Sequence, residues 1–384
     1  MKILLCTNAF ENITNGPAKF ANLVLQINEL YPKHQIRILT EDISESKLAS
    51  LKYVYKVELN FPKVLRVFGQ LLRMFSYYNK AKDIQKEFNY DVLVYINAFN
   101  GLWAAIASDT PTIGMINDYN NLAARLSTVS TEPRWLKKYI FKYLEKRSTR
   151  YHQAIISNSR YLTQQLIETY GMNPSKIYML YKAVDTSAIV FNPERAFASP
   201  VKILFVKADY PTGGLHILAK SLSLLPSIHF FLTIIGPPKR FRTDVLSLFE
   251  NMGNIEVQLL GDQPQQVVYE HLSQNDIFCV PSLKEALGVA NIEALASGIP
   301  VISTHTGGIP EVLDNGNNGW LVNLQDPPSL AAAIKDCIEN PQKRKTQAIN
   351  GLKFISKFSV NSMLNNFIRI LEDAISCKNT TSGS

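Results

Sequence analysis

The sequence predicts an α/β protein with two doubly wound parallel sheets, each covered by helices. Short apolar runs rich in β-forming residues alternate with amphipathic helical segments along the chain, and no hairpin signal joins two such runs. The 384 residues are enough for two domains, which would hold about 150 to 200 residues each. A hydrophobic content of 46% supports a large core in both domains. We expect these two Rossmann-like domains to face each other across a cleft.

The first domain is predicted over residues 1–190. The first strand, at residues 2–6, is followed by polar residues rather than by a long apolar signal segment. Gly16 and Pro17 are predicted to open a helix after this strand. Further buried strands of the first domain are expected at residues 36–39, 91–95, 111–116 and 154–159.

The second domain is predicted over residues 200–358, after a linker near residues 186–200. Its buried strands are expected at residues 201–206, 230–236, 255–260, 277–280 and 301–303. A helix over residues 359–376 should follow. The polar residues 377–384 are predicted to form a disordered tail.

The segment Pro281–Val322 is the most informative part of the chain. A strand ends at Pro281, and helical periodicity starts near Val289 and stops at a glycine followed by proline. Glu285 therefore falls in the loop and Glu293 on the helix. Even if all residues between them were helical, the two carboxylates would lie about 12 Å apart. That separation exceeds the roughly 5 to 9.5 Å of glycosidase acid pairs, so one hydrolytic pair is not expected.

Separate roles suit these residues better. Gly288 removes side-chain bulk where the loop enters the helix, and the N–H groups that follow can bind a diphosphate. Glu293, one turn further on, can accept hydrogen bonds from ribose hydroxyls. The N–H groups concerned are those of Val289, Ala290 and Asn291.

Four motifs occur in order in this part of the chain: Glu285-x7-Glu293, residues 296–301 (ASGIPV), residues 307–311 (GGIPE) and residues 315–319 (NGNNG). Together they resemble the retaining glycosyltransferases of family 4, which have the GT-B architecture. The resemblance implies that Glu285 faces the donor sugar, that Glu293 binds the nucleotide ribose and that the intervening amides bind the diphosphate. Gly236 and Asp262 would lie in loops that flank the base. The resemblance also implies that the first domain binds the acceptor, that the second binds the nucleotide sugar, and that the helix over residues 359–376 packs back on the first domain.

The chain departs from the family pattern in three places. Family members commonly have His-Asp where this chain has Asn117 and Asp118, and an amide can position a sugar hydroxyl but cannot take up a proton. Gly213 stands where a lysine is expected, which leaves Lys207 as the nearby cation. The glycine-rich loop of the first domain is reduced to Gly16. We therefore expect the diphosphate site to depend mainly on backbone amides.

The excess of basic over acidic residues lies entirely in the first half of the chain. Residues 1–199 contain 25 Lys and Arg against 16 acidic residues, whereas residues 200–384 contain 15 against 16. Residues 62–88 and 134–150 are basic amphipathic helical segments that contain aromatic residues. They fit either an ordinary solvated helix or a face that binds anionic lipid or a phosphorylated acceptor. This face would include Arg134, Lys137, Lys138 and Lys142.

No cofactor or metal is expected. The four cysteines are scattered without a Cys-x-x-Cys pair, which fits a reducing cytosol. No Asp-x-Asp pair follows a strand, so the nucleotide sugar should bind without metal. The basic segments carry no nucleic-acid-binding motif, so nucleic acid is not the expected partner.

The resemblance thus implies a transferase that moves a sugar from a UDP- or GDP-sugar to an acceptor hydroxyl. The acceptor would be a glycan or a lipid-linked molecule in cell-surface polysaccharide, lipopolysaccharide or glycolipid synthesis. The enzyme would be cytoplasmic, or peripheral on the inner face of the cytoplasmic membrane. Two alternatives remain open: a sugar-nucleotide epimerase on the same fold, and a noncatalytic partner subunit.

Overall fold

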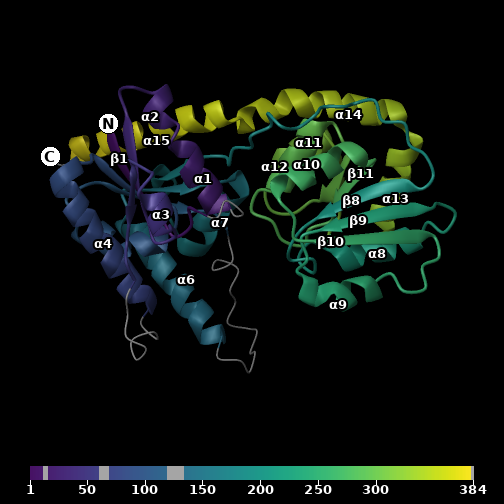
Figure 1. The fold of residues 1–384 in the computed structure, drawn as a ribbon, viewed down its shortest axis with the longest axis horizontal. Helices are drawn as coiled ribbons and strands as arrows, with labels where there is room; N and C mark the ends of the chain where they lie inside the picture. Colours follow the sequence, from purple (N-terminus) through teal and green to yellow (C-terminus); the bar gives the residue numbers. More distant parts are fainter. Residues whose placement is uncertain (12–15, 60–68, 119–133, 382–384) are drawn as a thin grey trace. The chain divides into compact units, whose positions relative to one another are not determined.

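The chain forms two compact units, each built around one parallel sheet. The computed structural model describes all residues except 12–15, 60–68, 119–133 and 382–384, and only the backbone of residues 134–138 and 377–381. Unit 1 consists of Met1–Lys182 and Val360–Ser384, and unit 2 consists of Ala183–Ser359. Helices pack against both sheets (Figure 1). The predicted α/β fold class is therefore confirmed.

The sheet of unit 1 has seven strands in the order β3-β2-β1-β4-β5-β6-β7, all parallel to their neighbours. From β1 the chain builds outward to β3, returns to β4 and then builds toward β7. The strand order therefore reverses between β1 and β4. The strands are β1 (Lys2–Thr7), β2 (Gln35–Thr40), β3 (Val54–Lys56), β4 (Val92–Tyr95), β5 (Thr112–Ile116), β6 (Ala154–Ser157) and β7 (Ile177–Met179).

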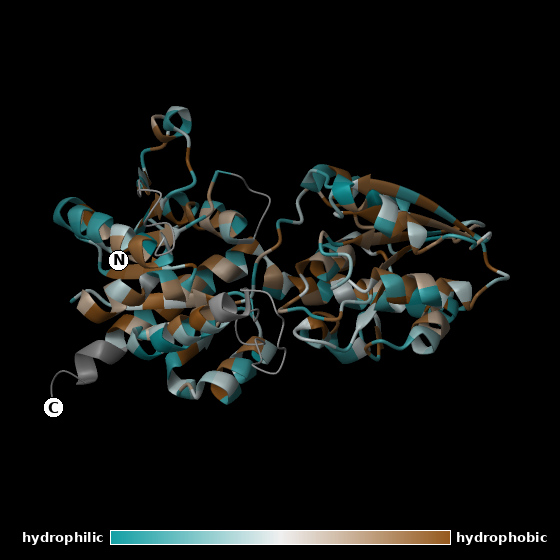
Figure 2. Ribbon diagram, turned by 90° about the horizontal axis from the view of Figure 1, so that it is seen from below, coloured by the Kyte–Doolittle hydropathy of each residue, from teal (hydrophilic) through white to brown (hydrophobic). Residues whose placement is uncertain are grey.

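Apolar runs form these strands because a parallel sheet is buried on both faces. In β1, an inner strand of the sheet, Ile3, Leu4 and Leu5 are fully buried. The strands of both sheets are mostly hydrophobic in Figure 2, whereas the helices alternate hydrophobic and hydrophilic residues. The helices thus contribute one apolar face each to the cores.

Helix α7 (Arg160–Tyr170) of unit 1 begins and ends at local sequence signals. The side chain of Ser159 caps α7 by accepting a hydrogen bond from the N–H of Leu162, and Gly171 ends this helix in the left-handed conformation. Residues 62–68 of the predicted basic segment lie outside the described residues. The α-helices of unit 1 that precede unit 2 in the chain are α1 (Gly16–Val24), α2 (Ile27–Leu30), α3 (Glu45–Leu48), α4 (Gly69–Phe88), α5 (Leu102–Ala107), α6 (Arg134–Tyr151) and α7 (Arg160–Tyr170).

The last helix, α15 (Val360–Thr381), belongs to unit 1 although it follows unit 2 in the chain. The rings of Phe367 and Phe20 pack edge to face with their centroids 5.4 Å apart. The helix runs to Thr381 instead of ending at residue 376 as expected from the polar tail. No glycine or proline interrupts it before Gly383.

The sheet of unit 2 has six parallel strands in the order β10-β9-β8-β11-β12-β13. Its strands are β8 (Val201–Val206), β9 (Phe230–Ile235), β10 (Ile255–Gly261), β11 (Ile277–Val280), β12 (Val301–Thr304) and β13 (Trp320–Val322). Its α-helices are α8 (Leu215–Ser223), α9 (Arg242–Ser247), α10 (Gln265–Gln274), α11 (Val289–Ser297), α12 (Ile309–Val312), α13 (Pro327–Glu339) and α14 (Pro341–Phe354).

The predicted linker packs on unit 2. Arg195 donates a hydrogen bond to the carbonyl of Asn275, which directly follows α10, at 2.5 Å. It donates another to the carbonyl of Ser297, the last residue of α11, at 3.2 Å. The guanidinium of Arg344 lies 3.9 Å from the ring centroid of Phe197. These contacts fix residues 183–200 to unit 2, and the chain crosses between the units after Lys182 and again after Ser359.

In the part of the chain that the structure describes, no helix is both long and apolar enough to cross a membrane.

Candidate active site

The predicted donor-site residues of unit 2 lie in loops at the carboxyl edge of its sheet or on helix α11, which follows one of these loops. The sheet order places β8 between β9 and β11. Successive strands are therefore added on one side of β8 up to β10 and on its other side from β11 onward, so the strand order reverses between β8 and β11. Open α/β sheets bind ligands outside the carboxyl ends of strands at such a reversal. Lys207 directly follows β8, and Glu285 lies in the loop after β11. The fold therefore brings these two residues to the expected position.

Lys207 and Glu285 form an ion pair. The Nζ of Lys207 donates to Oε2 of Glu285 at 2.5 Å, and the two side chains are only 25% and 22% exposed. The N–H of Ala286 donates to the other carboxylate oxygen at 3.2 Å. The carboxylate is thus held in one orientation, and an ammonium group with three donors lies beside it.

Gly213, which stands where the family pattern has a lysine, lies against Lys207. A Cβ atom at Gly213 would be 2.8 Å from Cγ of Lys207 and 2.7 Å from the ring of Phe205. No side chain fits there without moving these residues. Lys207 therefore occupies the space next to Gly213, which explains in physical terms why the chain has a glycine there.

The loop after β12 supports the backbone of Glu285. Gly307 has a φ of +56°, and a Cβ atom there would lie 1.6 Å from the carbonyl oxygen of Glu285. Only glycine allows both this conformation and this approach. The glycine turn after β12 thus fixes the loop that presents Glu285.

Helix α11 begins at Val289 and ends at Ser297, as predicted. Gly288 precedes it in the left-handed conformation, with a φ of +89°. The predicted diphosphate site needs one correction. The N–H of Asn291 donates to the carbonyl of Gly288 at 3.0 Å, because the first turn is tightened by a bond between residues three apart. It is therefore not available to an anion, and the N–H groups of Val289 and Ala290 are left for that role.

Glu293 lies on the buried side of α11 and is only 6% exposed. Its negative charge acts on Tyr269 of the neighbouring helix α10: burial chiefly, and Glu293 in second place, raise the pKa of the Tyr269 phenol. The phenol donates a hydrogen bond to the carbonyl of Asp185 at 3.3 Å. Glu293 and Tyr269 therefore lie close together in unit 2.

The loops predicted to flank the base join each other. The N–H of Gly236, after β9, donates to the carbonyl of Gly261 at 2.7 Å. Asp262 follows directly and is exposed. A Cβ atom at Gly236 would lie 2.6 Å from the backbone of Lys207, so this loop also packs against the loop of the ion pair.

In unit 1, Asn117 and Asp118 follow β5 at the carboxyl edge of the sheet. The Nδ2 of Asn117 donates to the carbonyl of Ile96 at 3.0 Å, so one of its two amide hydrogens is already used. The Nδ2 of the buried Asn158 donates to the carbonyl of Asn117 at 2.8 Å. These bonds connect the ends of β4, β5 and β6. Asp118 is exposed.

Gly16 is the first residue of α1, and a Cβ atom there would lie 3.2 Å from Nζ of Lys182. The start of this helix is therefore covered by a cation. Both residues belong to unit 1.

Two family models match consecutive parts of the chain. Residues 27–188 match Glycosyltransferase Family 4, and residues 189–354 match Glycosyl transferases group 1. The chain is a family 4 glycosyltransferase. The glycosyltransferase is therefore an enzyme of the transferase class, with the GT-B architecture that the four motifs predicted.

Relatives with long alignments agree with this assignment. The glycosyltransferase is 27% identical over 361 residues to an uncharacterized glycosyltransferase of Methanocaldococcus jannaschii, covering 94% of each chain. It is 29% identical over 196 residues to the amylovoran biosynthesis glycosyltransferase AmsK of Erwinia amylovora, covering 48% of this chain and 47% of AmsK. HepE of Anabaena, solved in complex with UDP, has the same fold, with a TM-score of 0.71, 19% identity and coverage of 97% of this chain and 100% of HepE.

The predicted acceptor or membrane face of the glycosyltransferase is described in part. Arg134, Lys137 and Lys138 are on the backbone of α6, but their side chains lie outside the described residues. Lys142 lines a groove of about 400 Å³ beside the same helix.

The sequence analysis did not single out three residues that contact predicted site residues within the same unit: Tyr269 in unit 2, and Asn158 and Lys182 in unit 1. Each acts through a contact with a residue distant in the chain, and none belongs to a glycine-rich or acidic motif. Asn158 had a local signal, because it directly follows a buried strand, as Asn117 does.

Proposed function

We propose that the glycosyltransferase moves a sugar from a UDP- or GDP-sugar to an acceptor hydroxyl with retention of the anomeric configuration. The observation that carries this proposal is the Lys207–Glu285 ion pair beside the start of α11, at the reversal point of the sheet. This arrangement offers a cation and backbone N–H groups to a diphosphate, and a fixed carboxylate to a sugar.

The diphosphate would bind at the N–H groups of Val289 and Ala290. These donors, the dipole of the nine-residue helix α11 and the Lys207 ammonium would stabilise the charge that develops on the leaving nucleotide diphosphate. Glu293, one turn further along α11, would accept hydrogen bonds from the ribose hydroxyls.

Glu285 would orient the donor sugar. Its carboxylate is already neutralised by Lys207 at 2.5 Å, which weakens it as a nucleophile but leaves it able to accept hydrogen bonds from sugar hydroxyls. Retention then follows if the acceptor hydroxyl attacks on the side that the leaving group vacates. A phosphate oxygen of the leaving group would accept the proton of that hydroxyl.

The relatives give the proposal its substrate class. HepE was solved with UDP, which supports a nucleotide-sugar donor, and AmsK is named for the synthesis of the polysaccharide amylovoran. We therefore propose a glycan or lipid-linked acceptor in cell-surface polysaccharide, lipopolysaccharide or glycolipid synthesis. The reaction would take place in the cytoplasm, at the inner face of the membrane, and without a metal.

The test separates nucleotide binding from turnover. Glu293→Ala should weaken UDP or GDP binding about ten- to a hundredfold, because a charge-assisted hydrogen bond contributes roughly 1.5 to 3 kcal/mol. Glu285→Gln should leave that affinity nearly unchanged and reduce turnover. Affinity would be measured by titration calorimetry, and turnover by release of the nucleotide from a panel of sugar nucleotides.

Glu256→Ala is the matched control, because this carboxylate is exposed on β10, away from the reversal point. Thermal unfolding would show that each variant is folded. Unchanged nucleotide affinity in Glu293→Ala would overturn the ribose assignment, and normal turnover in Glu285→Gln would place the reaction elsewhere. Loss of turnover on addition of a chelator would contradict metal independence.

A further inference from the structure

Helices α4, α5 and α6 form one continuous surface of unit 1. Their inner sides share a core cluster, in which Met74 of α4 and Leu102 of α5 are buried and Phe141 and Leu144 of α6 pack against them. The rings of Phe99 and Phe141 lie edge to face at 5.5 Å. The three helices are therefore neighbours, and their outer sides belong to the same part of the molecule.

This surface, which we call the three-helix surface, exposes large apolar side chains. In the described part of the chain, eight of the fourteen strongly exposed large apolar residues lie on these helices. Trp103 and Ile106 of the short helix α5 are 42% and 49% exposed, and Phe75 of α4 is 52% exposed. The other five are Leu71, Tyr139, Ile140, Tyr143 and Tyr151. Such a concentration marks an interaction surface.

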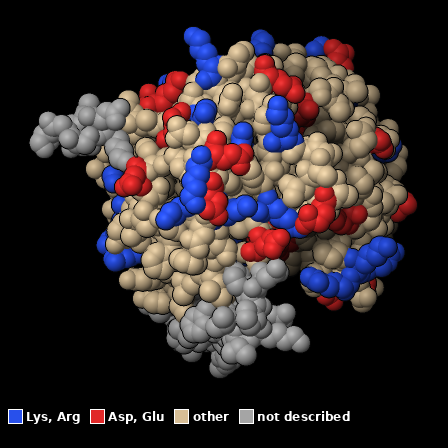
Figure 3. All heavy atoms as spheres, turned by 60° about the vertical axis from the view of Figure 1, so that its left-hand side comes forward, with Lys and Arg blue, Asp and Glu red and all other residues tan. Residues whose placement is uncertain are grey.

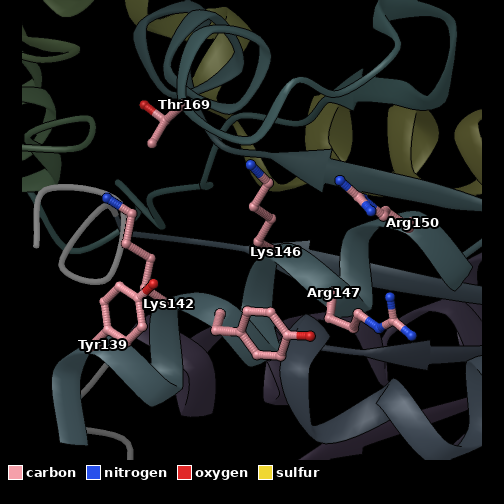
Figure 4. Close-up of a pocket in the computed structure, with 7 residues that line it drawn as sticks. Tyr139, Lys142, Lys146, Arg147, Arg150 and Thr169 are labelled. Carbon is pink, nitrogen blue, oxygen red and sulfur yellow. The ribbon is translucent and has the colours of Figure 1, made fainter. Parts of the chain in front are cut away.

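Helix α6 adds a groove lined by four of its cationic side chains. Residues four apart on a helix lie on one side of it, so Lys142, Lys146 and Arg150 form one row, and Tyr139, Tyr143 and Arg147 form another. Both rows line the groove, together with Thr169 of α7 (Figure 4). Figure 4 shows the cationic side chains extending from α6.

No acidic residue lines this groove in the described structure. The one acidic residue of α6, Glu145, is buried and accepts a hydrogen bond from the phenol of Tyr170 at 2.7 Å. Over the face that Figure 3 shows, acidic and basic side chains are intermixed. The groove is therefore a local concentration of four positive charges that would bind anionic groups.

We propose that the three-helix surface binds an anionic lipid bilayer, with lipid phosphates in the α6 groove and the apolar side chains of α4 and α5 in the head-group region. Tyrosine and tryptophan suit this boundary because their rings are apolar at one end and polar at the other. Cations near the bilayer attract its phosphates. A nucleic acid would satisfy the cations but would leave aliphatic residues such as Ile106 without an apolar environment.

This inference rests on the proposed function, which places the enzyme at the inner face of the membrane. Its test measures vesicle binding and does not require sugar transfer. The probe is vesicles of phosphatidylglycerol mixed with phosphatidylcholine, compared with phosphatidylcholine alone, in a sedimentation assay at low and high salt. The full chain should bind the anionic vesicles, and salt should weaken the binding.

Two variants separate the parts of the surface. In Lys142→Gln/Lys146→Gln/Arg147→Gln, affinity for anionic vesicles should fall on the order of a hundredfold, since each cation contributes about fivefold. In Trp103→Asn/Ile106→Asn, affinity should fall while its salt dependence is retained. The matched control is Lys220→Gln/Lys335→Gln/Lys353→Gln, which removes three exposed charges from unit 2.

Equal binding by the groove variant and the control would overturn the inference, as would equal binding to the two kinds of vesicle. A protein that releases nucleotide normally but does not bind vesicles would refute this inference and leave the transferase proposal intact. Vesicle binding by a protein that transfers no sugar would support this inference and refute the transferase proposal.

Discussion

Gly307 gives the sharpest test of how the glycine turn after β12 supports the loop of Glu285. Replacing it with alanine places a Cβ atom 1.6 Å from the carbonyl oxygen of Glu285, at a φ of +56°. The positive φ alone costs about 1 to 2 kcal/mol for a residue with a Cβ atom, and the displacement of a packed neighbour adds about 1 to 3 kcal/mol. We expect a loss of about 2 to 5 kcal/mol in the unfolding free energy of unit 2.

Gly316→Ala is the control for this variant. Gly316 also has a positive φ, of +100°, but no atom lies within 4 Å of its added Cβ. It should show the strain of the backbone without the displacement of Glu285. Stability would be measured by denaturant unfolding, and function by turnover and nucleotide affinity. If Gly307→Ala matched Gly316→Ala in both stability and turnover, the turn would not position Glu285 and the reasoning would fail.

Two further predictions concern unit 1. Burial lowers the pKa of His152 from 6.5 to about 4. Between these pH values, the unfolded chain therefore binds a proton that the folded protein does not. The contribution of His152 to the free energy of unfolding should be fully present above pH 6.5 and should fall by about 3 kcal/mol as the pH drops to 4. Denaturant unfolding across this range should show that slope, and His152→Gln should flatten it; an unchanged slope would contradict the assignment. Asn158→Ala removes the bond that holds the carbonyl of Asn117, and loss of a buried hydrogen bond costs about 1 to 3 kcal/mol. We expect the free energy of unfolding to fall by that amount and turnover to fall with nucleotide affinity unchanged; a matching loss of affinity would show a wider structural effect.

The sequence predicted the elements that have local signals. Helix α11 was predicted from Val289 to the glycine stop because Gly288 and Gly298 mark its two ends, and both have the left-handed conformation in the structure. The alternation of apolar runs and helical periods predicted both sheets, because a strand buried on two faces is apolar throughout.

The side-chain partners could not be predicted, because they depend on strand order. Lys207 and Glu285 are 78 residues apart and meet only because β8 and β11 are adjacent in the sheet. The short strands β3, β7 and β13 were missed because three residues carry too little periodicity. The bond at Asn291 was missed because the tightening of a first helical turn leaves no trace in the residue types.

The position of α15 sets the order in which the protein can be completed during synthesis. Phe20 and its neighbours on α1 cannot meet Phe367 until the ribosome has added the whole of unit 2. At about 5 to 20 residues per second, this takes on the order of ten seconds or more. During that time the apolar face that α15 will cover remains open, and the unit that begins the chain is the last to be finished. A nascent chain that stalls within unit 2 would therefore expose this face to chaperones and proteases, even though residues 1–182 have already been made.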